Sequence, residues 1–495
     1  ATLNTPSHTE SILKSLPEYG AECPKYLDGM FAFALWDDER QKLFVARDRF
    51  GKKPLYYAQD ADGVLFVASE IKALLKAGIH GEIDPQAIDN YLTLMYIPPW
   101  KSVYKNIHTL LPAHSATFAR GVLTVRRYWQ MEYKPIAVSY DEAKTEVKRL
   151  FEQAVKKRMV ADVEVGALLS GGVDSTLVTA YAQKYSSHPI KTFSVGYGDH
   201  INELPFAKQG SEAIGTDHYT VQASGDAAQE LKTIIAYMDE PHADSSNFPQ
   251  HVVSKLASSK VKVALSGDGA DELFLGYGWH SKYWNERKIV QLKNMLFSNP
   301  FKEHLRRMSI FSERERRRLW KDASAVNTDT VSKETLSRTR NDLTKINLFD
   351  LTTYLPGQLL TKIDRTSMMH SLEVRSPFLD HQLAEYVFNL PVEYKMDTKN
   401  SKIILKDILC EIMPKEFAYR KKQGFGAPVI AWLRAGGMHV LAQETLGNPQ
   451  AKLYQFLNKA EVDKLLEAFY KHNDDSVHYK LWVLLCLELW LQTHA

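Results

Sequence analysis

The sequence predicts an α/β protein: a β-rich N-terminal part, then a doubly wound parallel sheet, then a helical extension. Residues 1 to about 130 contain short apolar runs separated by turn residues, which is typical of antiparallel strands. From about residue 140, strand-length apolar runs alternate with helical periodicity, which indicates a parallel sheet covered by helices. Beyond about residue 280 the periodicity is mostly helical.

Composition narrows the class of protein. The chain has 495 residues, 44% hydrophobic and 24% charged, as in globular proteins with two or three domains. Its 62 basic and 59 acidic residues give no charge excess that would attract a polyanion or a membrane surface. The three cysteines form neither a zinc spacing nor a disulfide framework, and no signal peptide is evident. We therefore expect a cytoplasmic protein with no nucleic-acid or membrane partner.

The N-terminal part reads as a set of hairpins. "GMFAFALWD" and "KLFVARD" are apolar runs on either side of the charged turn "DDERQ". "VLFVAS" and "HSATFARGVLTVRRYW" continue the same pattern. We place the end of this first domain at residue 135 and assign residues 136–495 to the second.

The second domain opens with a helix at Asp141. One face of this helix carries apolar side chains at helical spacing (Ala143, Val147, Leu150, Phe151, Ala154 and Val155). The predicted strands that follow are "VEVGALL", "IKTFSVGY", "DHYTVQ" and "VKVAL", and the predicted helices between them include "TLVTAYAQKY" and "FAKQGSEAIG". Near the C-terminus, "LWVLLCLELWL" is too short to span a bilayer and contains Glu488, so we expect a buried helix.

The turn "LLSGGVDST", residues 168–176, carries the main functional signal. A strand, a Gly-rich turn and a helix together form an anion-binding arrangement, because backbone N–H groups point at the ligand. The usual phosphate loop also needs a lysine, and this turn has Asp174 instead. An acid can face a phosphate only through a cation such as Mg²⁺. The turn therefore predicts a metal-assisted pyrophosphate site, and the alternative is an ordinary βα turn.

A second turn, "LSGDGADELFLGY", repeats this design at the end of another predicted strand. It places Asp268, Asp271 and Glu272 beside glycines. Ligands of open parallel sheets bind at the carboxyl ends of the strands. Two such turns at matching strand ends favour a nucleotide and metal site over two unrelated loops.

These motifs, taken together, resemble those of a known family. "SGGVDS" resembles the PP-loop of ATP pyrophosphatases. Together with "SGDGADE", "DEPHADSSNFP", "RTSMMHSLEVRSPFLDH" and "RKKQGFGAPV" it resembles the class B glutamine-dependent asparagine synthetases. "LDGMFAFALWD" and "ARDRFGKKPLYY" resemble the glutaminase domain of that family, which has an N-terminal-nucleophile (Ntn) fold. The resemblance implies a partial glutaminase domain over 1–135 and a PP-loop synthetase domain over 136–495.

The resemblance implies a reaction and its residues. ATP adenylates a carboxylate, most simply the aspartate side chain, pyrophosphate leaves, and ammonia then forms the amide. The resemblance assigns pyrophosphate binding to the loop Ser170, Gly171, Gly172, Asp174 and Ser175, and nucleotide contacts to Leu168, Val195, Ser266 and Gly267. It assigns Mg²⁺ to Asp174 and Asp271, catalytic roles to Lys422 and Asp268, and the amino-acid head group to Asp244, Ser245 and Ser246. Asp268 stands where the family often has glutamate.

The glutaminase part departs from the family. The family's nucleophile is an N-terminal cysteine whose own α-amine acts as base. The given sequence starts with Ala1, and Cys23 is internal. Asp28 matches a glutamine-binding acid of the family. We expect this chain as given to use ammonium and not glutamine; truncation, processing and a natural ammonia-dependent variant all remain as explanations.

Several rival interpretations stay open. Another carboxylate, such as a sugar acid, could be amidated, or an internal amine could close a β-lactam-type ring. A tRNA-modifying PP-loop protein and a silent nucleotide-binding subunit are rivals of other classes, and a homodimer is one option for assembly. The run "SERERRRLWK" favours a solvated helix, and Glu373 with Arg375 favours a structural ion pair. His370, His381, Trp482 and Trp490 are expected to pack or hydrogen-bond.

Overall fold

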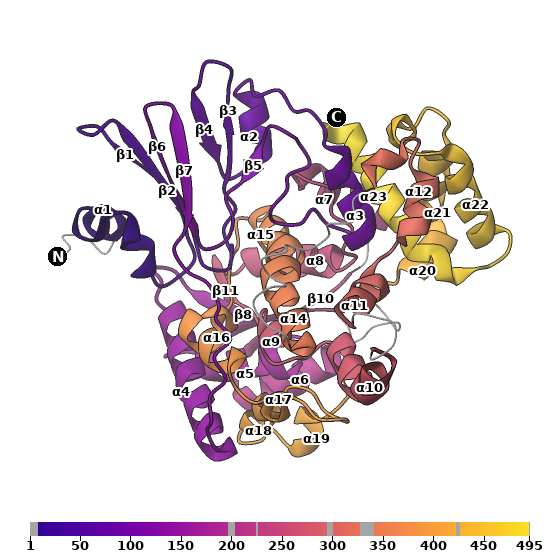
Figure 1. Cartoon of the computed structure of the whole chain (residues 1–495). Helices are drawn as coiled ribbons and strands as arrows, with labels where there is room; N and C mark the ends of the chain where they lie inside the picture. Colours follow the sequence, from indigo (N-terminus) through magenta and orange to yellow (C-terminus); the bar gives the residue numbers. More distant parts are fainter. Residues whose placement is uncertain are drawn as a thin grey trace. The chain divides into compact units, whose positions relative to one another are not determined.

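A computed structural model describes residues 8–196, 203–223, 226–294, 300–326, 341–421 and 426–494. The chain divides into two compact units: residues 1–87 with 98–132, and residues 88–97 with 133–495. Figure 1 gives the labels of the helices and strands. The fold is α/β with both antiparallel and parallel sheets. The boundary predicted at residue 135 remains a prediction.

The first unit contains two antiparallel sheets, with strand orders β1-β2-β6-β7 and β4-β3-β5. The predicted hairpin around "DDERQ" is confirmed, since β1 pairs antiparallel with β2 from Ala32–Arg47 to Asp37–Lys42. Val45 and Ala116 pack with Leu55 and Leu110 in a buried apolar cluster. The elements are α1 (His8–Tyr19), η1 (Gly20–Lys25), β1 (Ala32–Asp37), β2 (Lys42–Arg47), β3 (Tyr56–Gln59), β4 (Leu65–Ala68), α2 (Ile71–Lys76), β5 (His108–Thr109), β6 (His114–Ala119) and β7 (Val122–Arg127). Helix α3 (Pro85–Leu94) starts at the end of this unit's first segment, and most of it belongs to the second unit.

The second unit is built on a five-stranded parallel sheet in the order β10-β9-β8-β11-β12. Helices flank both faces of this sheet, with α4, α5 and α6 below it and α8 and α15 above it in Figure 1. The alternation predicted from the sequence is therefore confirmed. The elements of this part are α4 (Tyr140–Arg158), β8 (Val165–Leu168), α5 (Val173–Lys184), β9 (Lys191–Gly196), α6 (Leu204–Ile214), β10 (Asp217–Gln222), α7 (Ala227–Tyr237), α8 (Asn247–Ser258), β11 (Val263–Leu265), α9 (Ala270–Leu273) and β12 (Glu373–Arg375).

Helix α4 shows why the sequence starts a helix where it does. Ser139 accepts the backbone N–H of Glu142, and the Glu142 carboxylate accepts the backbone N–H of Ser139. This reciprocal capping box pairs two donors that would otherwise lack partners at a helix start. The predicted apolar face is buried, with Ala143 and Val147 fully inaccessible to solvent. The helix was predicted to begin at Asp141, and in the structure it begins one residue earlier, at Tyr140.

The remainder of the second unit is mostly helical, as predicted. Its elements are α10 (Gly278–Asn294), α11 (Pro300–Met308), α12 (Glu313–Leu319), η2 (Ala323–Ala325), α14 (Asp342–Phe349), η3 (Asp350–Leu359), α15 (Leu360–Met368), η4 (Pro377–Leu379), α16 (His381–Phe388), α17 (Val392–Lys395), α18 (Ile403–Leu409), α19 (Lys415–Ala418), α20 (Val429–Arg434), α21 (Gly436–Gly447), η5 (Lys452–Gln455), α22 (Lys459–Tyr470), η6 (Asp475–Val477) and α23 (His478–His494).

The C-terminal helix α23 is buried, as its composition predicts. Trp482 and Trp490 are at most 1% exposed. Glu488 is also buried, and its carboxylate accepts the backbone N–H groups of Lys452 and Leu453 at 3.0 and 2.7 Å. A buried acid is tolerable when hydrogen bonds replace its hydration. None of the helices within the described ranges is long and apolar enough to cross a membrane.

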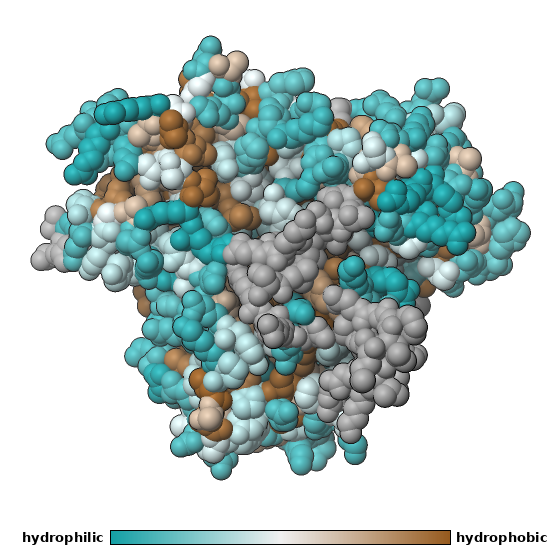
Figure 2. Space-filling view, in the orientation of Figure 1, coloured by the Kyte–Doolittle hydropathy of each residue, from teal (hydrophilic) through white to brown (hydrophobic). Residues whose placement is uncertain are grey.

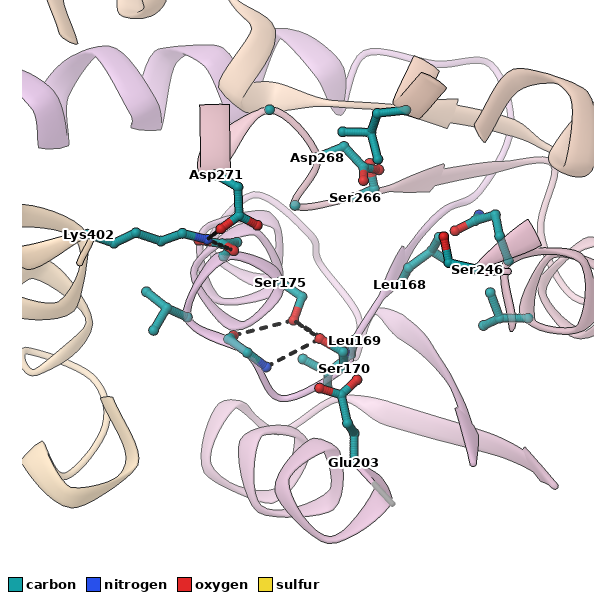
Figure 3. Close-up of a pocket in the computed structure, with 18 of the residues that line it drawn as sticks. Leu168, Leu169, Ser170, Ser175, Glu203, Ser246, Ser266, Asp268, Asp271 and Lys402 are labelled. Carbon is teal, nitrogen blue, oxygen red and sulfur yellow. Dashed lines mark hydrogen bonds and ion pairs between the residues drawn. The ribbon is translucent and has the colours of Figure 1, made fainter. Parts of the chain in front are cut away.

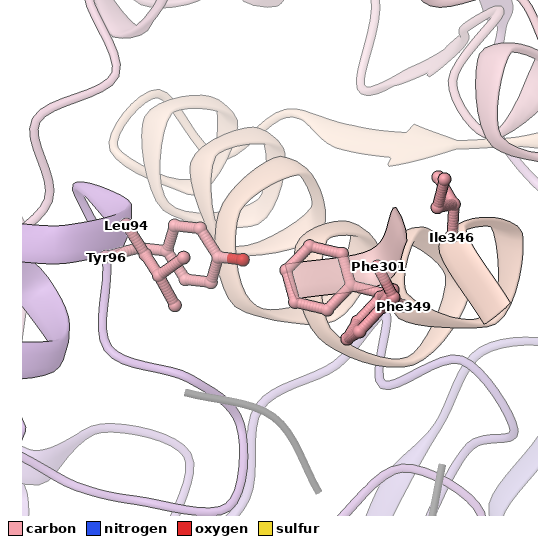
Figure 4. Packing of buried hydrophobic residues seen from close by; sticks show 5 residues of the cluster. All are labelled: Leu94, Tyr96, Phe301, Ile346 and Phe349. Atoms are coloured by element: carbon pink, nitrogen blue, oxygen red, sulfur yellow. The ribbon is translucent and has the colours of Figure 1, made fainter. Parts of the chain in front are cut away.

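The segment 88–97 belongs to the second unit, although more than thirty residues of the first unit separate it from the rest of the second unit in the sequence. Leu94 and Tyr96 pack against Phe301, Ile346 and Phe349 in one buried cluster (Figure 4). The backbone N–H of Ala243 donates to the carbonyl of Met95 at 2.9 Å. The segment therefore supports the loop that precedes α8.

The surface run "SERERRRLWK" forms α12, and its side chains behave in two ways. Arg317 and Glu313 are about half exposed and pair at 2.8 Å, which agrees with a solvated helix. Hydrophilic side chains cover this region around α12 and α22 in Figure 2. Arg316 is instead buried and pairs with Asp89 at 3.0 Å. The predicted ion pair of Glu373 with Arg375 is confirmed at 2.6 Å.

Candidate active site

Most of the predicted site residues line one cavity of about 460 Å³ in the second unit. It lies at the carboxyl ends of β8, β9 and β11, where an open parallel sheet is expected to bind ligands. Figure 3 shows Ser170 and Ser175 of the turn after β8 and Asp268 and Asp271 of the turn after β11 around this cavity. The predicted residues that line it are Leu168, Ser170, Gly172, Asp174, Ser175, Val195, Asp244, Ser246, Ser266, Gly267, Asp268 and Asp271.

The turn between β8 and α5 is shaped by Gly171. Its φ is +74°, and an added Cβ would lie 2.5 Å from the backbone carbon of Phe206. Only glycine avoids both the left-handed strain and this contact. Two serine hydroxyls close the loop, since the backbone N–H of Ser170 donates to Ser175 Oγ at 3.2 Å and the two hydroxyls lie 3.1 Å apart.

The N-terminus of α5 points its dipole at the cavity. Its first helical residues follow Gly172, which has no side chain to accept their N–H groups. Uncapped N–H groups at a helix start, together with the helix dipole, favour an anion. Arg420 adds positive charge at the rim, and its Nη2 donates to the carbonyl of Gly171 at 2.9 Å. The turn can therefore hold a phosphate group without the usual lysine.

The turn after β11 packs directly on this loop. A Cβ added at Gly267 would lie 2.8 Å from Cβ of Asp174, so glycine allows the two turns to touch. Asp268 follows, and burial is the main reason that its pKa is raised; nearby Asp271 and Asp174 raise it further, while Lys362 and a hydrogen bond with Ser266 oppose the rise. A carboxyl group with a raised pKa in a cavity is typical of functional sites.

Lys402 lies between the two carboxylates expected to bind metal. Its Nζ is 2.5 Å from Asp174 Oδ2 and 2.7 Å from Asp271 Oδ1 (Figure 3). Burial alone would lower the pKa of Lys402, but the two carboxylates outweigh burial and raise it well above its usual value. The ammonium therefore marks a point where the two acids hold a cation.

The donor set at this point fits Mg²⁺. Magnesium commonly takes one or two carboxylates and fills the remaining positions with phosphate oxygens and water. Asp174 and Asp271 converge on a single point, and among the described residues no group of three or more His, Cys, Asp or Glu side chains is arranged so that it could hold a metal ion. A metal here would depend on the nucleotide's phosphates for further ligands, and Lys402 would have to move away from the acids.

Glu272, which follows Asp271 in the sequence, is fully buried and lines the same cavity. Its Oε1 accepts the hydroxyl of Tyr277 at 2.5 Å. Burial is the main cause that raises the pKa of Glu272 to about 8, and the charge of Asp271 contributes. Burial and the neighbouring charge therefore favour the neutral form of this carboxyl group.

The loop expected to bind the amino-acid head group lines the other end of the cavity. Asp244 Oδ1 accepts the backbone N–H and the hydroxyl of Ser246 at 2.9 and 2.7 Å. Trp482 Nε1 donates to the carbonyl of Ala243 at 2.9 Å, so α23 fixes the loop. Ser245 is buried in this loop but does not line the cavity.

Lys422 lies outside the described residues. Asp28 belongs to the first unit, where it is exposed in the loop between η1 and β1. Arg49 holds this loop by donating to the carbonyls of Lys25 and Leu27 at 2.6 Å.

Several residues of the cavity were not predicted from the sequence. Lys402, Lys406, Lys362, Tyr354 and Arg420 also line the cavity. Tyr354 lies on η3, Lys362 on α15, and Lys402 and Lys406 at α18, all outside the quoted motifs. Arg420 is the first residue of the motif "RKKQGFGAPV", but no role was predicted for it. Glu272 was part of a recognised motif, but its burial could not be read from the motif.

Comparison with known proteins identifies the family. Residues 146–492 match the family model described as asparagine synthase, and residues 1–129 match a glutamine amidotransferase domain. The chain belongs to the asparagine synthetase family. It is 32% identical over 520 residues to asparagine synthetase [glutamine-hydrolyzing] 1 of Bacillus subtilis, covering 99% of this chain and 81% of that protein. As a member of the asparagine synthetase family, the protein is a ligase.

Two further relatives extend the comparison. A putative asparagine synthetase [glutamine-hydrolyzing] of Mycobacterium tuberculosis is 34% identical over 532 residues, covering 99% of this chain and 80% of that protein. The asparagine synthetase [glutamine-hydrolyzing] of Homo sapiens is 28% identical over 416 residues, covering 81% of this chain and 63% of that protein.

Proposed function

We propose that this member of the asparagine synthetase family makes asparagine from aspartate in an ATP-dependent reaction that releases AMP and pyrophosphate. The observation that carries the proposal is the meeting of two Gly-rich turns in one cavity, with Asp174 and Asp271 converging beside the start of α5. A phosphate turn with carboxylates and no lysine suits release of pyrophosphate better than transfer of the terminal phosphoryl group.

In the proposed first step, an oxygen of the substrate's side-chain carboxylate attacks the α-phosphorus of ATP. The bond from the α-phosphorus to the bridging oxygen breaks, and pyrophosphate leaves with its electron pair. The proposed role of Ser170, Gly172 and the first N–H groups of α5 is to bind the departing pyrophosphate. Mg²⁺ held by Asp174 and Asp271 would supply positive charge next to that group when bound.

In the proposed second step, ammonia attacks the acyl carbon, AMP leaves, and the nitrogen loses a proton. Lys422 is the proposed cation that stabilises the negative charge of both transition states, which is where a fixed charge contributes most. Asp268 is proposed to contact the reacting carboxyl end of the amino acid. Leu168, Val195, Ser266 and Gly267 are the proposed nucleotide contacts.

The products of ATP distinguish this function from its rivals. Incubation with ATP, Mg²⁺, aspartate and ammonium, followed by ³¹P NMR, is expected to show AMP and pyrophosphate in step with asparagine. Asp174→Asn is expected to remove most turnover, because it deletes a charge that faces the metal while nearly preserving shape. Formation of ADP and inorganic phosphate, or turnover only with added tRNA, would contradict the proposal. Replacing ammonium by glutamine in the same assay identifies the nitrogen donor.

A further inference from the structure

A buried lysine and aspartate lie side by side at the end of the cavity away from Lys402. Lys362, on α15, is 7% exposed and lines the cavity together with Asp244 and Ser246. Its Nζ donates to Ser246 Oγ at 2.8 Å and lies 3.4 Å from Asp244 Oδ2. In Figure 3, Asp268 lies between the Lys402–Asp271 contact and Ser246.

The geometry of this pair differs from that of a purely structural ion pair on the same helix. Arg365, one turn further along α15, contacts Asp239 at 2.7 Å, and both side chains are nearly inaccessible. The Lys362–Asp244 contact is longer, and its side chains border an open cavity. A lysine ammonium has three N–H donors, of which Ser246 and Asp244 account for two. One donor of Lys362 can therefore face a ligand.

The aspartate of the pair keeps its charge in this buried place. Burial would raise the pKa of Asp244, but Lys362 and His242, together with the hydrogen bonds from Ser246, outweigh it and hold the pKa well below its ordinary value. Oδ1 of Asp244 is used by Ser246, while Oδ2 has only the long contact with Lys362 among the contacts of the described residues. The cavity wall thus presents one positive and one negative group next to each other.

An α-amino acid head group has the complementary pattern, because its ammonium and carboxylate are separated by a single carbon. We propose that Lys362 and Asp244 form the subsite for this head group, with Lys362 binding the α-carboxylate and Asp244 the α-ammonium. The proposal rests on the proposed function, because it takes aspartate as the substrate. It adds Lys362 as a specificity-determining residue.

The position of the pair agrees with the direction of the proposed reaction. One methylene separates the head group of aspartate from its reacting carboxyl group. Lys362 is close enough to Asp268 to oppose the rise in the pKa of that acid. A head group held at Lys362 and Asp244 would direct the side-chain carboxylate past Asp268, toward the turn that binds the phosphates. Acids without a matching head group would leave the buried pair unsatisfied, which is the kind of defect that gives strong discrimination.

Three ligands separate the two halves of the subsite. Aspartate has both charged groups, β-alanine lacks the α-carboxylate, and succinate lacks the ammonium. Dissociation constants are measured by calorimetry in the presence of a non-hydrolysable ATP analogue. Lys362→Met is expected to weaken aspartate binding roughly a hundredfold while changing β-alanine binding little. Asp244→Asn is expected to weaken aspartate binding by a similar factor while changing succinate binding little.

Two further variants serve as controls for this experiment. Lys406→Met removes another cavity lysine, from α18, and should leave the ratio of aspartate to β-alanine affinity unchanged. If Lys362→Met does not fold because Asp244 is left without its counter-charge, the double variant Lys362→Met/Asp244→Asn removes both charges. That variant should lose affinity for aspartate by a larger factor than for either analogue.

Equal losses for aspartate and β-alanine in Lys362→Met, or for all three ligands in the double variant, would overturn the subsite and leave Lys362 as a support for the loop. A different result tests the proposed function itself. If the unaltered protein releases no pyrophosphate from ATP with aspartate and ammonium, the proposed function fails, whatever the variants bind.

Discussion

Gly171 sets the shape of the phosphate turn through a single backbone angle. Its φ of +74° is unfavourable for any residue with a Cβ, and the added atom would meet the backbone of Phe206 and Ala207 at 2.5 and 2.6 Å. Gly172, next to it, has a φ of −69°, and its nearest side-chain neighbour is Ser170 Oγ at 3.3 Å. The two glycines therefore differ in how well they tolerate a methyl group.

Gly171→Ala is expected to destabilise the protein by at least ~2 kcal/mol, from left-handed strain and backbone overlap together. Gly172→Ala, the matched control, is expected to cost less than half as much. Thermal unfolding of both variants without ligand measures the difference. Equal melting temperatures for the two variants would mean that the turn relaxes freely, contrary to the packing of Gly171 against α6.

Lys402 neutralises two acids of the cavity. Its side chain is 5% exposed and those of Asp174 and Asp271 about a fifth exposed, so removing the ammonium leaves two partly buried like charges facing each other. Lys402→Met is expected to cost about 3 kcal/mol, at the low end for broken buried ion pairs because the acids keep some water.

Magnesium should then replace the missing ammonium. Without nucleotide, Mg²⁺ is expected to raise the melting temperature of Lys402→Met more than that of the unaltered protein. Lys406→Met is the control, because Lys406 lines the same cavity and lies over the ring of Tyr419 at 5.1 Å. The same Mg²⁺ response in all three proteins would place the metal elsewhere.

At the scale of elements, a buried lysine donates hydrogen bonds to the carbonyl groups at the end of α16. Lys395, on α17, is 3% exposed, and its Nζ donates to the carbonyls of Val387 and Phe388 at 3.0 and 3.4 Å. Burial lowers the pKa of Lys395 from 10.5 to about 7, against a small opposing effect of Glu393. The unfolded chain therefore binds a proton that the folded protein releases between about pH 7 and pH 10.5.

This difference in proton binding gives a pH dependence with a definite sign. Because the unfolded state holds more protons in that range, stability rises with pH between about 7 and 10.5, and the penalty of the charged lysine is fully present below pH 7. Lys395→Met is expected to be more stable than the unaltered protein at pH 6.5, by roughly a few kcal/mol, and to lose most of this advantage by pH 9.5. Melting temperatures of the variant and the unaltered protein at both pH values test this prediction. If the difference between the two proteins is the same at both pH values, Lys395 does not titrate in that range.

At the scale of the whole molecule, contacts between distant parts of the sequence decide what each residue does. Arg316 and Arg317 are adjacent in a basic run, yet Arg316 bonds Asp89, 227 residues away, with Trp320 Nε1 donating to the same acid at 2.8 Å. Tyr91 similarly donates to the carbonyl of Val483 at 2.8 Å. The segment 88–97 is thus fixed to α12 and α23.

Arg316→Met is expected to destabilise the protein by about 3–5 kcal/mol, because Asp89 is left buried without its counter-charge. Arg317→Met is expected to change stability by no more than about 0.5 kcal/mol, as is usual for an exposed pair. Chemical denaturation of the two variants gives the comparison. Similar effects in both would mean that the buried contact with Asp89 contributes nothing.

The sequence by itself determined the class of fold, the alternation of strands and helices, the two Gly-rich turns and the family. These features are local: a turn that needs glycine, an apolar run or a capping serine acts within a few residues, so the order of residues carries it. For the same reason the hairpin at "DDERQ", the helix predicted to open at Asp141 and the buried C-terminal helix could be predicted. The structure confirms these elements, with the helix starting at Tyr140.

Only the tertiary structure decided the order of the strands and the inclusion of segment 88–97 in the second unit. It also decided which lysines line the cavity and pair with its acids. Lys362 on α15 and Lys402 just before α18 belong to no motif. They matter because the fold brings them to Asp174, Asp271 and Asp244 from 118 to 228 residues away. A lysine exposed to water and a lysine held between carboxylates have the same sequence signal. Burial and neighbouring charge, which the fold alone supplies, give them different chemistry.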